Sequence, residues 1–155
     1  MKGQYDENLN FLLTFFDCMN IKVVDTSGTT DFCFMPNKKE VHIPKKEVED
    51  GSVEKLEICF HEAGHSTDLV LKRNINNYAF EELIAECTGF LMLKQTDNNT
   101  FITDLRNVAY LSSWIQALIK KKKDIYEVEK IIKKALMYAD DAADLIIEKG
   151  GFKNE

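Results

Sequence analysis

The chain has 155 residues, of which 45% are hydrophobic and 30% are charged, and its formal net charge at pH 7 is −6. This length supports one hydrophobic core and is too short for two ordinary domains, so we expect a single domain over residues 1–155. The acidic balance disfavours broad binding to nucleic acid phosphates, although it does not exclude a local basic patch.

The sequence argues against a membrane protein or an exported one. No apolar stretch reaches the roughly 20 residues of a bilayer span, and the polar opening MKGQYDENLN lacks the basic start of a signal peptide. The four cysteines form no C-x-x-C pair, which favours buried, reduced thiols over a disulfide frame. We therefore expect a cytoplasmic protein without a membrane partner.

The first third of the chain predicts one helix and three short strands. Residues 7–19 carry apolar side chains three and four positions apart, as in an amphipathic helix. Short β-branched or aromatic segments at 21–26, 31–35 and 40–44 predict strands, and the turn sequence Pro36–Lys39 predicts that the last two form a hairpin.

The remaining elements are predicted to be helices from their apolar periodicity and their capping residues. The expected helices cover residues 53–70, 78–93, 101–119 and 126–147. Ser52 is the expected cap of the first helix, and Asn76 or Asn77 that of the second. The predicted fold class is α+β, with an N-terminal helix, a small three-stranded sheet and a C-terminal helical bundle.

The segment 58–68, ICFHEAGHSTD, holds two of the three histidines of the chain. His61 and His65 share one helix face and can direct two imidazole nitrogens at one ion. Glu62 lies about 100° round the helix, close enough to reach a water on that ion without being a ligand. H-E-x-x-H on a helix is the zincin signature, with two metal ligands and a general base. Gly64 within this helix, where glycine costs up to about 1 kcal/mol, is tolerable if another backbone or strand packs closely there.

A helix that carries two histidines without a metal is the alternative interpretation, because a pattern with two free positions also arises by chance. The context favours the metal site: the motif follows a hairpin and precedes a helix rich in carboxylates.

A catalytic metal needs a third protein ligand and an open position for water. The helix at 78–93 offers Glu81, Glu82 and Glu86. Glu81 lies on one flank of the apolar face and is interpreted as a solvated charge, whereas Glu82 and Glu86 share the other flank and need a partner. We predict Glu82 as the third ligand and Glu86 as the group that orients a ligand histidine, although the two roles could be exchanged.

Two other features favour structural interpretations. His42, within the segment 40–44, is expected to be an ordinary strand side chain. The lysines at 120–123 are expected to be a solvated helix terminus and not a phosphate-binding site. The strand at 40–44 itself is expected to hold an extended substrate by strand addition.

Five segments in order resemble the zincin-like metallopeptidase domain of ArdC-type antirestriction proteins, which occur on conjugative plasmids and phages. They are DFCFMPNKKEVHIP, HEAGH, YAFEELIAEC, NVAYLSSWIQAL and KKALMYADDAADLI. Related domains occur in phage polyvalent proteins, and ImmA/IrrE-like peptidases have a similar ligand arrangement. The resemblance implies that His61 and His65 bind the metal, that Glu62 is the catalytic acid/base, and that a glutamate of EELIAE completes the ligand set.

Two departures from this family limit what the resemblance implies. ArdC-type proteins carry an N-terminal domain that binds single-stranded DNA, whereas only about twenty residues precede the first predicted strand here. DNA binding is therefore not carried over. The family also usually has bulkier residues around the second histidine than HEAGHSTD does, which affects the shape of the pocket.

Tyr110, in AYLSSW, is a candidate to donate a hydrogen bond to the oxyanion, a role that zincins often give to a tyrosine or histidine. The alternative, which the pattern favours, is that Tyr110 packs on the core together with Trp114.

The expected function is that of a zinc metallopeptidase that hydrolyses a protein or peptide, with an antirestriction or anti-defence role in a phage or mobile element. Zn²⁺ is the expected cofactor, and another divalent ion would fit the same donors. The alternative is a non-catalytic zincin-fold module that binds and blocks a host defence protein or contacts DNA.

Overall fold

The computed structural model describes residues 2–50, 53–96, 113–117, 119–120 and 125–151. The labelled elements, in chain order, are α1 (Lys2–Cys18), β1 (Lys22–Asp25), β2 (Cys33–Met35), β3 (Glu40–Ile43), α2 (Lys45–Glu49), α3 (Val53–Ser66), α4 (Asp68–Leu71), α5 (Tyr78–Thr96) and α7 (Ile125–Gly150). Residues 113–117 are also helical. The α+β class predicted from the sequence is confirmed, with the small sheet before the helical part of the chain.

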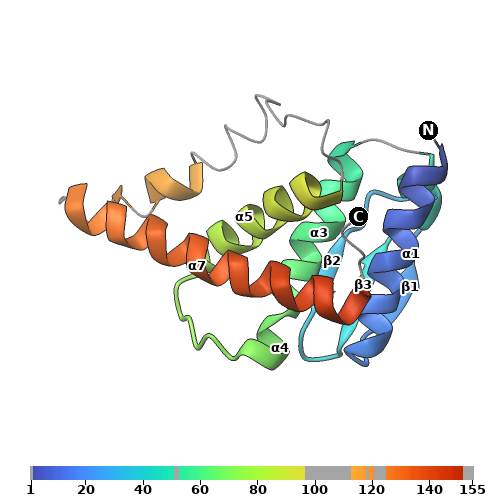
Figure 1. Ribbon diagram of the computed structural model, residues 1–155, viewed down its shortest axis with the longest axis horizontal. Helices are drawn as coiled ribbons and strands as arrows, with labels where there is room; N and C mark the ends of the chain where they lie inside the picture. The colour runs from blue at the N-terminus through green and yellow to red at the C-terminus, as the bar shows by residue number, and fades with distance from the viewer. Residues whose placement is uncertain (1, 51–52, 97–112, 118, 121–124, 152–155) are drawn as a thin grey trace.

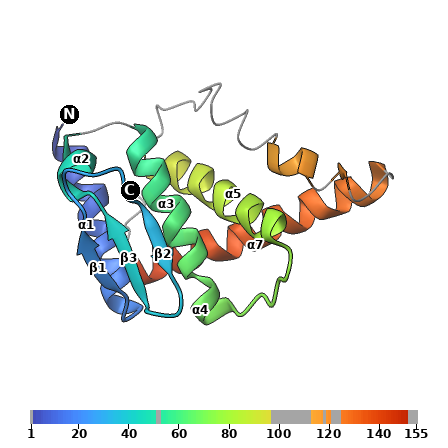
Figure 2. The same ribbon diagram turned by 180° about the vertical axis from the view of Figure 1, so that it is seen from behind.

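The sheet has the strand order β1-β3-β2. β3 runs parallel to β1 and antiparallel to β2, and the predicted hairpin places Cys33 opposite His42 and Phe34 opposite Val41. Because both edges of β3 are paired, the expectation that this strand holds an extended substrate is wrong. The free edge beside α3 belongs to β2 (Figure 2).

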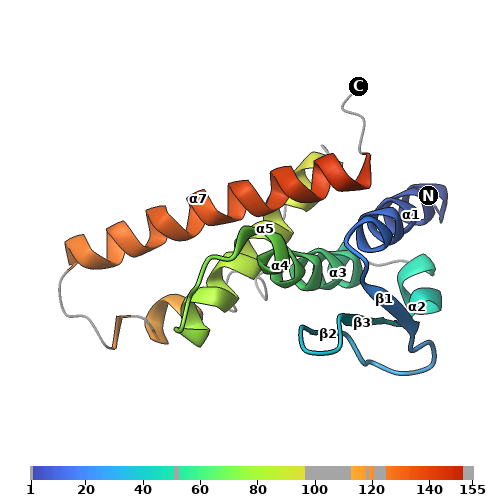
Figure 3. The same cartoon turned by 90° about the horizontal axis from the view of Figure 1, so that it is seen from below.

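The helix that carries the H-E-x-x-H motif lies at the centre of the molecule. α3 packs against α5, α5 packs against α7, and α1 contacts both α3 and α7. The sheet and α7 lie on opposite sides of α3 (Figures 1 and 3). Histidines on α3 can therefore meet carboxylates on α5 at a site bordered by the sheet.

Two apolar clusters hold these layers together. The larger one joins α1, β3, α3 and α7 through fully buried side chains, including Phe15, Phe16, Val41, Phe60 and Ile146. The smaller one joins α5 to α7 through Leu83, Ile84, Cys87, Ala135 and Ala139. Burial of each phenylalanine, leucine, isoleucine or valine side chain in these clusters contributes about 1.5–3 kcal/mol, so the packing around α3 and α5 is well anchored.

Close packing of α3 on α5 depends on a glycine. A Cβ at Gly64 would lie 3.1 Å from Cβ and 3.2 Å from Cγ2 of Thr88, and 3.4 Å from Cα of Ala85. The close packing that makes a glycine tolerable here is therefore present, mainly against the side chain of Thr88. It brings the faces of α3 and α5 that carry the motif residues within reach of one another.

The predicted helix at 53–70 is divided into α3 and α4. The hydroxyls of Ser66 and Thr67 donate hydrogen bonds of 2.6 Å to the carbonyls of Ala63 and Gly64. Such side-chain bonds compete with the helical pattern, which accounts for the end of α3 at Ser66.

Other boundaries follow the prediction more closely. Asn77 is the cap of α5, because its Oδ1 accepts a hydrogen bond of 3.2 Å from the N–H of Phe80. α7 ends at Gly150, and the φ angle of +71° at Gly151 is the left-handed conformation that commonly follows a helix. The short α2 was not predicted.

All four cysteines are free, as expected, but only Cys59 and Cys87 are buried. Cys18 is exposed and Cys33 is half-buried, so the expectation of buried thiols is wrong for these two. In the described part of the chain, no helix combines the length and the apolarity that crossing a bilayer requires.

Candidate metal centre

His61 and His65 on α3 converge with Glu82 on α5. The Nε2 atoms of the two histidines lie 3.1 Å apart. One carboxylate oxygen of Glu82 lies 3.1 Å from Nε2 of His61, and the other lies 3.0 Å from Nε2 of His65. Only 8% of His61 and 7% of Glu82 is exposed, so the three donors meet in a largely dehydrated place.

This donor set fits a divalent cation. Ligands placed tetrahedrally at about 2.0–2.1 Å from a zinc ion lie about 3.3 Å from one another, close to the separations seen here. Two imidazole nitrogens and a carboxylate oxygen suit Zn²⁺ and also accept other divalent transition metals. The group can therefore hold one ion and leave a fourth position open.

Glu86 contacts the same histidine from its other side. Its Oε2 lies 2.9 Å from Nδ1 of His61, and only 3% of the residue is exposed. A carboxylate on one ring nitrogen directs the other nitrogen toward a metal. The geometry therefore favours Glu82 as the ligand and Glu86 as the orienting group, the assignment preferred from the sequence over the exchanged one.

Without a metal these groups form a charged hydrogen-bonded cluster. Burial disfavours the imidazolium of His61, but the hydrogen bonds to Glu82 and Glu86 outweigh it and raise the pKa of His61 to about 10. Burial also works against ionisation of Glu82, yet the two histidines lower the pKa of Glu82 to about 2. An incoming cation must therefore displace a proton from His61 at neutral pH.

Glu62 is held in place by a hydrogen bond from the sheet. The backbone N–H of Phe34 on β2 donates a hydrogen bond of 3.0 Å to Oε2 of Glu62. Burial raises the pKa of Glu62, although the charges of His65 and His61 and this hydrogen bond oppose it. A carboxylate with a raised pKa beside two metal-binding groups has the properties of a general base.

A cavity of about 410 Å³ opens beside the cluster and is lined by Glu62, His65 and Glu82. Tyr78, at the start of α5 and 71% exposed, also lines it, and the charge of Glu82 raises the pKa of Tyr78. The sequence interpretation missed this tyrosine. Its position four residues before Glu82, hence on the same helix face, was the available signal.

Glu81 is not the solvated charge that the sequence suggested. Its Oε1 accepts a hydrogen bond of 2.6 Å from Nη2 of Arg73, whose side chain is 1% exposed. Nη1 of Arg73 donates a bond of 2.9 Å to the hydroxyl of Thr67. This arginine therefore links the end of α3 to the start of α5, next to the metal-binding cluster.

The remaining predicted residues have different outcomes. Tyr110 and the lysines at 121–123 lie outside the described residues. Trp114 is partly buried and contacts Tyr78 edge to face, with ring centroids 5.3 Å apart, as the packing interpretation expected.

His42 has two carboxylate neighbours: Asp31 lies 2.8 Å from its Nδ1 and Glu40 lies 3.6 Å from its Nε2. It lies in β3, as predicted, and its ring is hydrogen-bonded to Asp31.

An H-E-x-x-H helix joined to a glutamate-bearing helix and bordered by a small sheet defines a zincin-like fold. The zincin-like metallopeptidase family model matches residues 13–130, and the chain belongs to this family. This confirms the class of protein that the resemblance implied.

Two solved structures of the antirestriction ArdC protein from the R388 plasmid are similar to the chain. The metal-free structure has a TM-score of 0.63 and 27% identity, covering 92% of this chain and 52% of that one. The Mn(II)-bound structure has a TM-score of 0.63 and 26% identity, covering 92% and 53%. The chain therefore spans about half the length of that protein. Among curated proteins no significant match is found.

Proposed function

We propose that the chain is a divalent-metal-dependent peptidase, with Zn²⁺ as the expected ion. The observation that carries this proposal is the convergence of His61, His65 and Glu82 beside Glu62 in a cavity large enough for a peptide side chain. Membership of the zincin-like metallopeptidase family supports it.

His61, His65 and Glu82 would hold the ion through two Nε2 atoms and a carboxylate, and Glu86 would keep the ring of His61 in place. When bound, a divalent cation supplies Lewis acidity toward a carbonyl and lowers the pKa of a water. Glu62 would accept a proton from the attacking water and return it to the leaving amine. The N–H of Phe34 aims this carboxylate.

An extended peptide would bind along the free edge of β2. The N–H and the carbonyl of one residue point to the same side of a strand. The N–H of Phe34 points to Glu62, so the carbonyl of Phe34 also points away from β3, to the outer edge of β2. A peptide could pair with this edge by strand addition while one side chain enters the cavity. This arrangement moves the expected substrate strand from β3 to β2.

A tyrosine would stabilise the oxyanion. Among the described residues, Tyr78 lines the cavity and approaches Glu82, which supports it as the donor. Tyr110 stays the candidate predicted from the sequence. A donor aimed at developing negative charge contributes about 10²–10³-fold to the rate in well-formed sites.

The biological role we propose is antirestriction or anti-defence activity for a phage or mobile element, with a host protein as substrate. The similarity to the antirestriction ArdC protein supports this role. A second candidate function is a non-catalytic module that blocks a host defence protein, which the similarity to an antirestriction protein supports equally well. Binding to DNA is less well supported than binding to a protein, because the net charge of −6 disfavours contact with phosphates.

One variant separates the two candidates. Glu62→Gln removes the proton acceptor and keeps every proposed ligand, so it should bind metal as wild type does. Metal-loaded wild type and variant are incubated with a proteome-derived peptide library, and new termini are identified by mass spectrometry. The peptidase proposal expects cleavage by wild type alone. Antirestriction activity in cells that survives Glu62→Gln, with no cleavage by either protein, would favour the binding module.

A further inference from the structure

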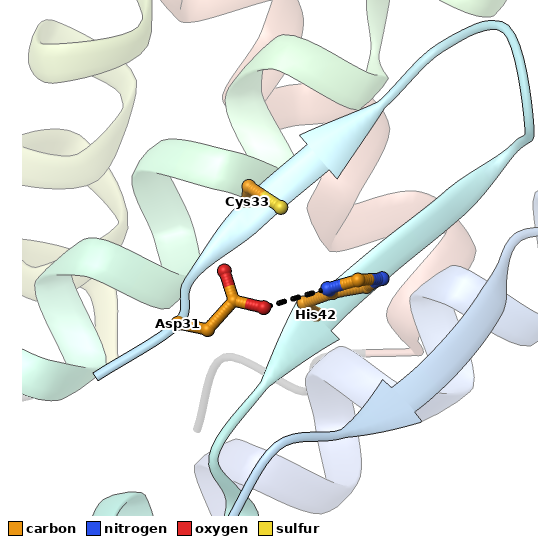
Figure 4. A group of neighbouring side chains, drawn as sticks. All are labelled: Asp31, Cys33 and His42. Carbon is orange, nitrogen blue, oxygen red and sulfur yellow. Dashed lines mark hydrogen bonds and ion pairs between the residues drawn. The ribbon is translucent and has the colours of Figure 1, made fainter. Parts of the chain in front are cut away.

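A second cluster of metal-binding side chains lies on the β2–β3 hairpin, apart from the site on α3 and α5. Figure 4 shows Asp31, just before β2, together with Cys33 and His42. One donor atom from each residue lies within 4.8 Å of the others. Oδ2 of Asp31 is 2.8 Å from Nδ1 of His42. The three donors are a carboxylate, a thiol and an imidazole.

The hairpin register places these side chains together. Cys33 and His42 are directly opposite in the antiparallel pair, and such pairs point to the same face of a sheet. The neighbouring Val41 and Ile43 point the other way and are fully buried in the core. The side chain of His42 is 19% exposed and that of Asp31 is 49% exposed, so an ion can reach them from solvent.

The second ring nitrogen of His42 also has a carboxylate neighbour. Oε2 of Glu40 lies 3.6 Å from Nε2 of His42. Histidines that bind metals usually present their other nitrogen to such a group. At this distance Glu40 is not hydrogen-bonded to His42, unlike Glu86 to His61, but a small movement would let it orient the ring while Nδ1 stays directed toward Asp31.

The backbone that carries Asp31 is also held in place. The hydroxyl of Thr26 donates a hydrogen bond of 2.7 Å to the carbonyl of Asp31, and the N–H of Asp31 donates one of 3.1 Å to the hydroxyl of Thr29. These bonds fix the approach of the chain to β2. A metal would thus meet donors whose backbone is already arranged by the turn and by the hairpin.

We propose that Asp31, Cys33 and His42 form a second cation site that binds Zn²⁺ or a similar thiophilic ion, with water at the fourth position. On binding, the S–H bond of Cys33 breaks, the sulfur bonds to the metal, and the proton passes to solvent. A thiolate donor selects zinc over manganese or magnesium, whereas the nitrogen and oxygen donors on α3 and α5 accept several ions.

Occupancy of this site would act on the strand that positions Glu62. Cys33 precedes Phe34, whose N–H binds the Glu62 carboxylate, and Cys33 also lines the cavity beside that glutamate. An ion bound to both strands would fix the hairpin and hence the free edge of β2. The site thus supplies a zinc-dependent element next to the main centre, independent of whether that centre is catalytic.

Cobalt substitution tests the proposal, because a thiolate bound to Co²⁺ gives a near-ultraviolet charge-transfer band that nitrogen and oxygen ligands do not give. Reduced, metal-free full-length protein is titrated with Co²⁺. We expect the band in wild type, its loss in Cys33→Ser, and its retention in Cys18→Ser, which removes the exposed thiol of α1. Absence of the band in wild type, or its survival in Cys33→Ser, would overturn the proposal.

Native mass spectrometry gives a second readout that does not depend on the thiol variant. Wild type should bind two Zn²⁺ but one Mn²⁺ per chain. The mild surface change Asp31→Asn should lower the zinc count to one. His61→Ala should remove the other ion and keep the cobalt band, so failure of the main centre and failure of this site are distinguishable. A single zinc in wild type that is kept in Asp31→Asn and lost in His61→Ala, or two zinc ions in Asp31→Asn, would contradict the proposal.

Discussion

The backbone N–H of Phe34 lies 3.0 Å from Oε2 of Glu62, and this hydrogen bond joins the edge of the sheet to the H-E-x-x-H helix. The donor is not used within the hairpin, because the N–H of Phe34 points away from β3, toward the outer edge of β2. It favours the ionised carboxylate and so opposes the burial that raises the pKa of Glu62.

Replacing this single N–H should change the pH dependence of cleavage. Proline is tolerated at an edge position whose nitrogen faces outward, so Phe34→Pro removes the donor while the sheet is kept. The pKa of Glu62 should rise, and the acid limb of the pH–rate profile should move to higher pH with unchanged metal content. Phe34→Leu keeps the N–H and serves as the control. An identical acid limb in both variants would disprove this role.

Tyr78 should affect turnover more than metal binding. Tyr78→Phe removes the hydroxyl that approaches Glu82, and we expect kcat to fall by up to about 10²-fold with little change in KM. Tyr126→Phe is the matched control, since this tyrosine is similarly exposed, at 72% against 71%, but lies on α7. Tyr110→Phe tests the candidate predicted from the sequence. If only Tyr110→Phe lowered kcat, Tyr110 and not Tyr78 would be the oxyanion donor.

Periodicity and spacing were sufficient for the elements that carry the site. The apolar pattern predicted the helices of the two histidines and of Glu82, and the turn sequence predicted the hairpin, because these signals are local. The one-turn spacing of Glu82 and Glu86 placed both carboxylates on one flank of the helix, but it left their two roles exchangeable.

Relationships between distant segments could not be predicted in this way. The hydrogen bond from Phe34 to Glu62 depends on which strand occupies the sheet edge, and strand order is not encoded in any local pattern. Arg73 lies in an irregular segment, so nothing in its neighbours signals that its guanidinium is buried. The pairing of Cys33 with His42 became evident only from the hairpin register.

Metal content should distinguish the two buried glutamates. Glu82→Gln removes a carboxylate that lies within 3.1 Å of both histidine nitrogens, so the main centre should lose its ion. Glu86→Gln removes only the carboxylate that orients the ring of His61, so we expect the affinity for the metal to fall by about 10- to 100-fold. Competition with a chelator of known affinity measures the metal affinity of each variant. Equal losses in the two variants would contradict the assignment, and so would a larger loss in Glu86→Gln.

The metal-free protein should lose stability on the alkaline side. The pKa of His61 is raised from 6.5 to about 10, so its contribution is fully present below pH 6.5 and is lost as the pH rises to 10. The pKa of Glu82 is lowered from 4.5 to about 2, so its contribution is lost between pH 4.5 and 2. The two pKa shifts arise largely from the same contact between His61 and Glu82. This contact stabilises the folded protein most between pH 4.5 and 6.5.

Urea denaturation with chelator present should therefore show the free energy of unfolding falling by a few kcal/mol between pH 6.5 and 10. Glu82→Gln should flatten this slope. Saturating zinc should remove it as well, because the imidazole of His61 is neutral when it binds a metal. A slope that is the same in wild type and Glu82→Gln would place its origin elsewhere in the chain.

Arg73 should be essential for stability, because its buried guanidinium compensates Glu81 across a contact of 2.6 Å. Removing one partner of a buried ion pair leaves the other charge without compensation and costs about 3–5 kcal/mol, whereas replacing both with apolar residues costs much less. Urea denaturation should thus find Arg73→Met far less stable than the double variant with Glu81→Met. The exposed pair Lys133–Glu129, 2.9 Å apart, is the control, and Lys133→Met should cost at most about 1 kcal/mol. Equal losses in the single and double Arg73 variants would mean that Arg73 acts through Thr67 and the end of α3 instead.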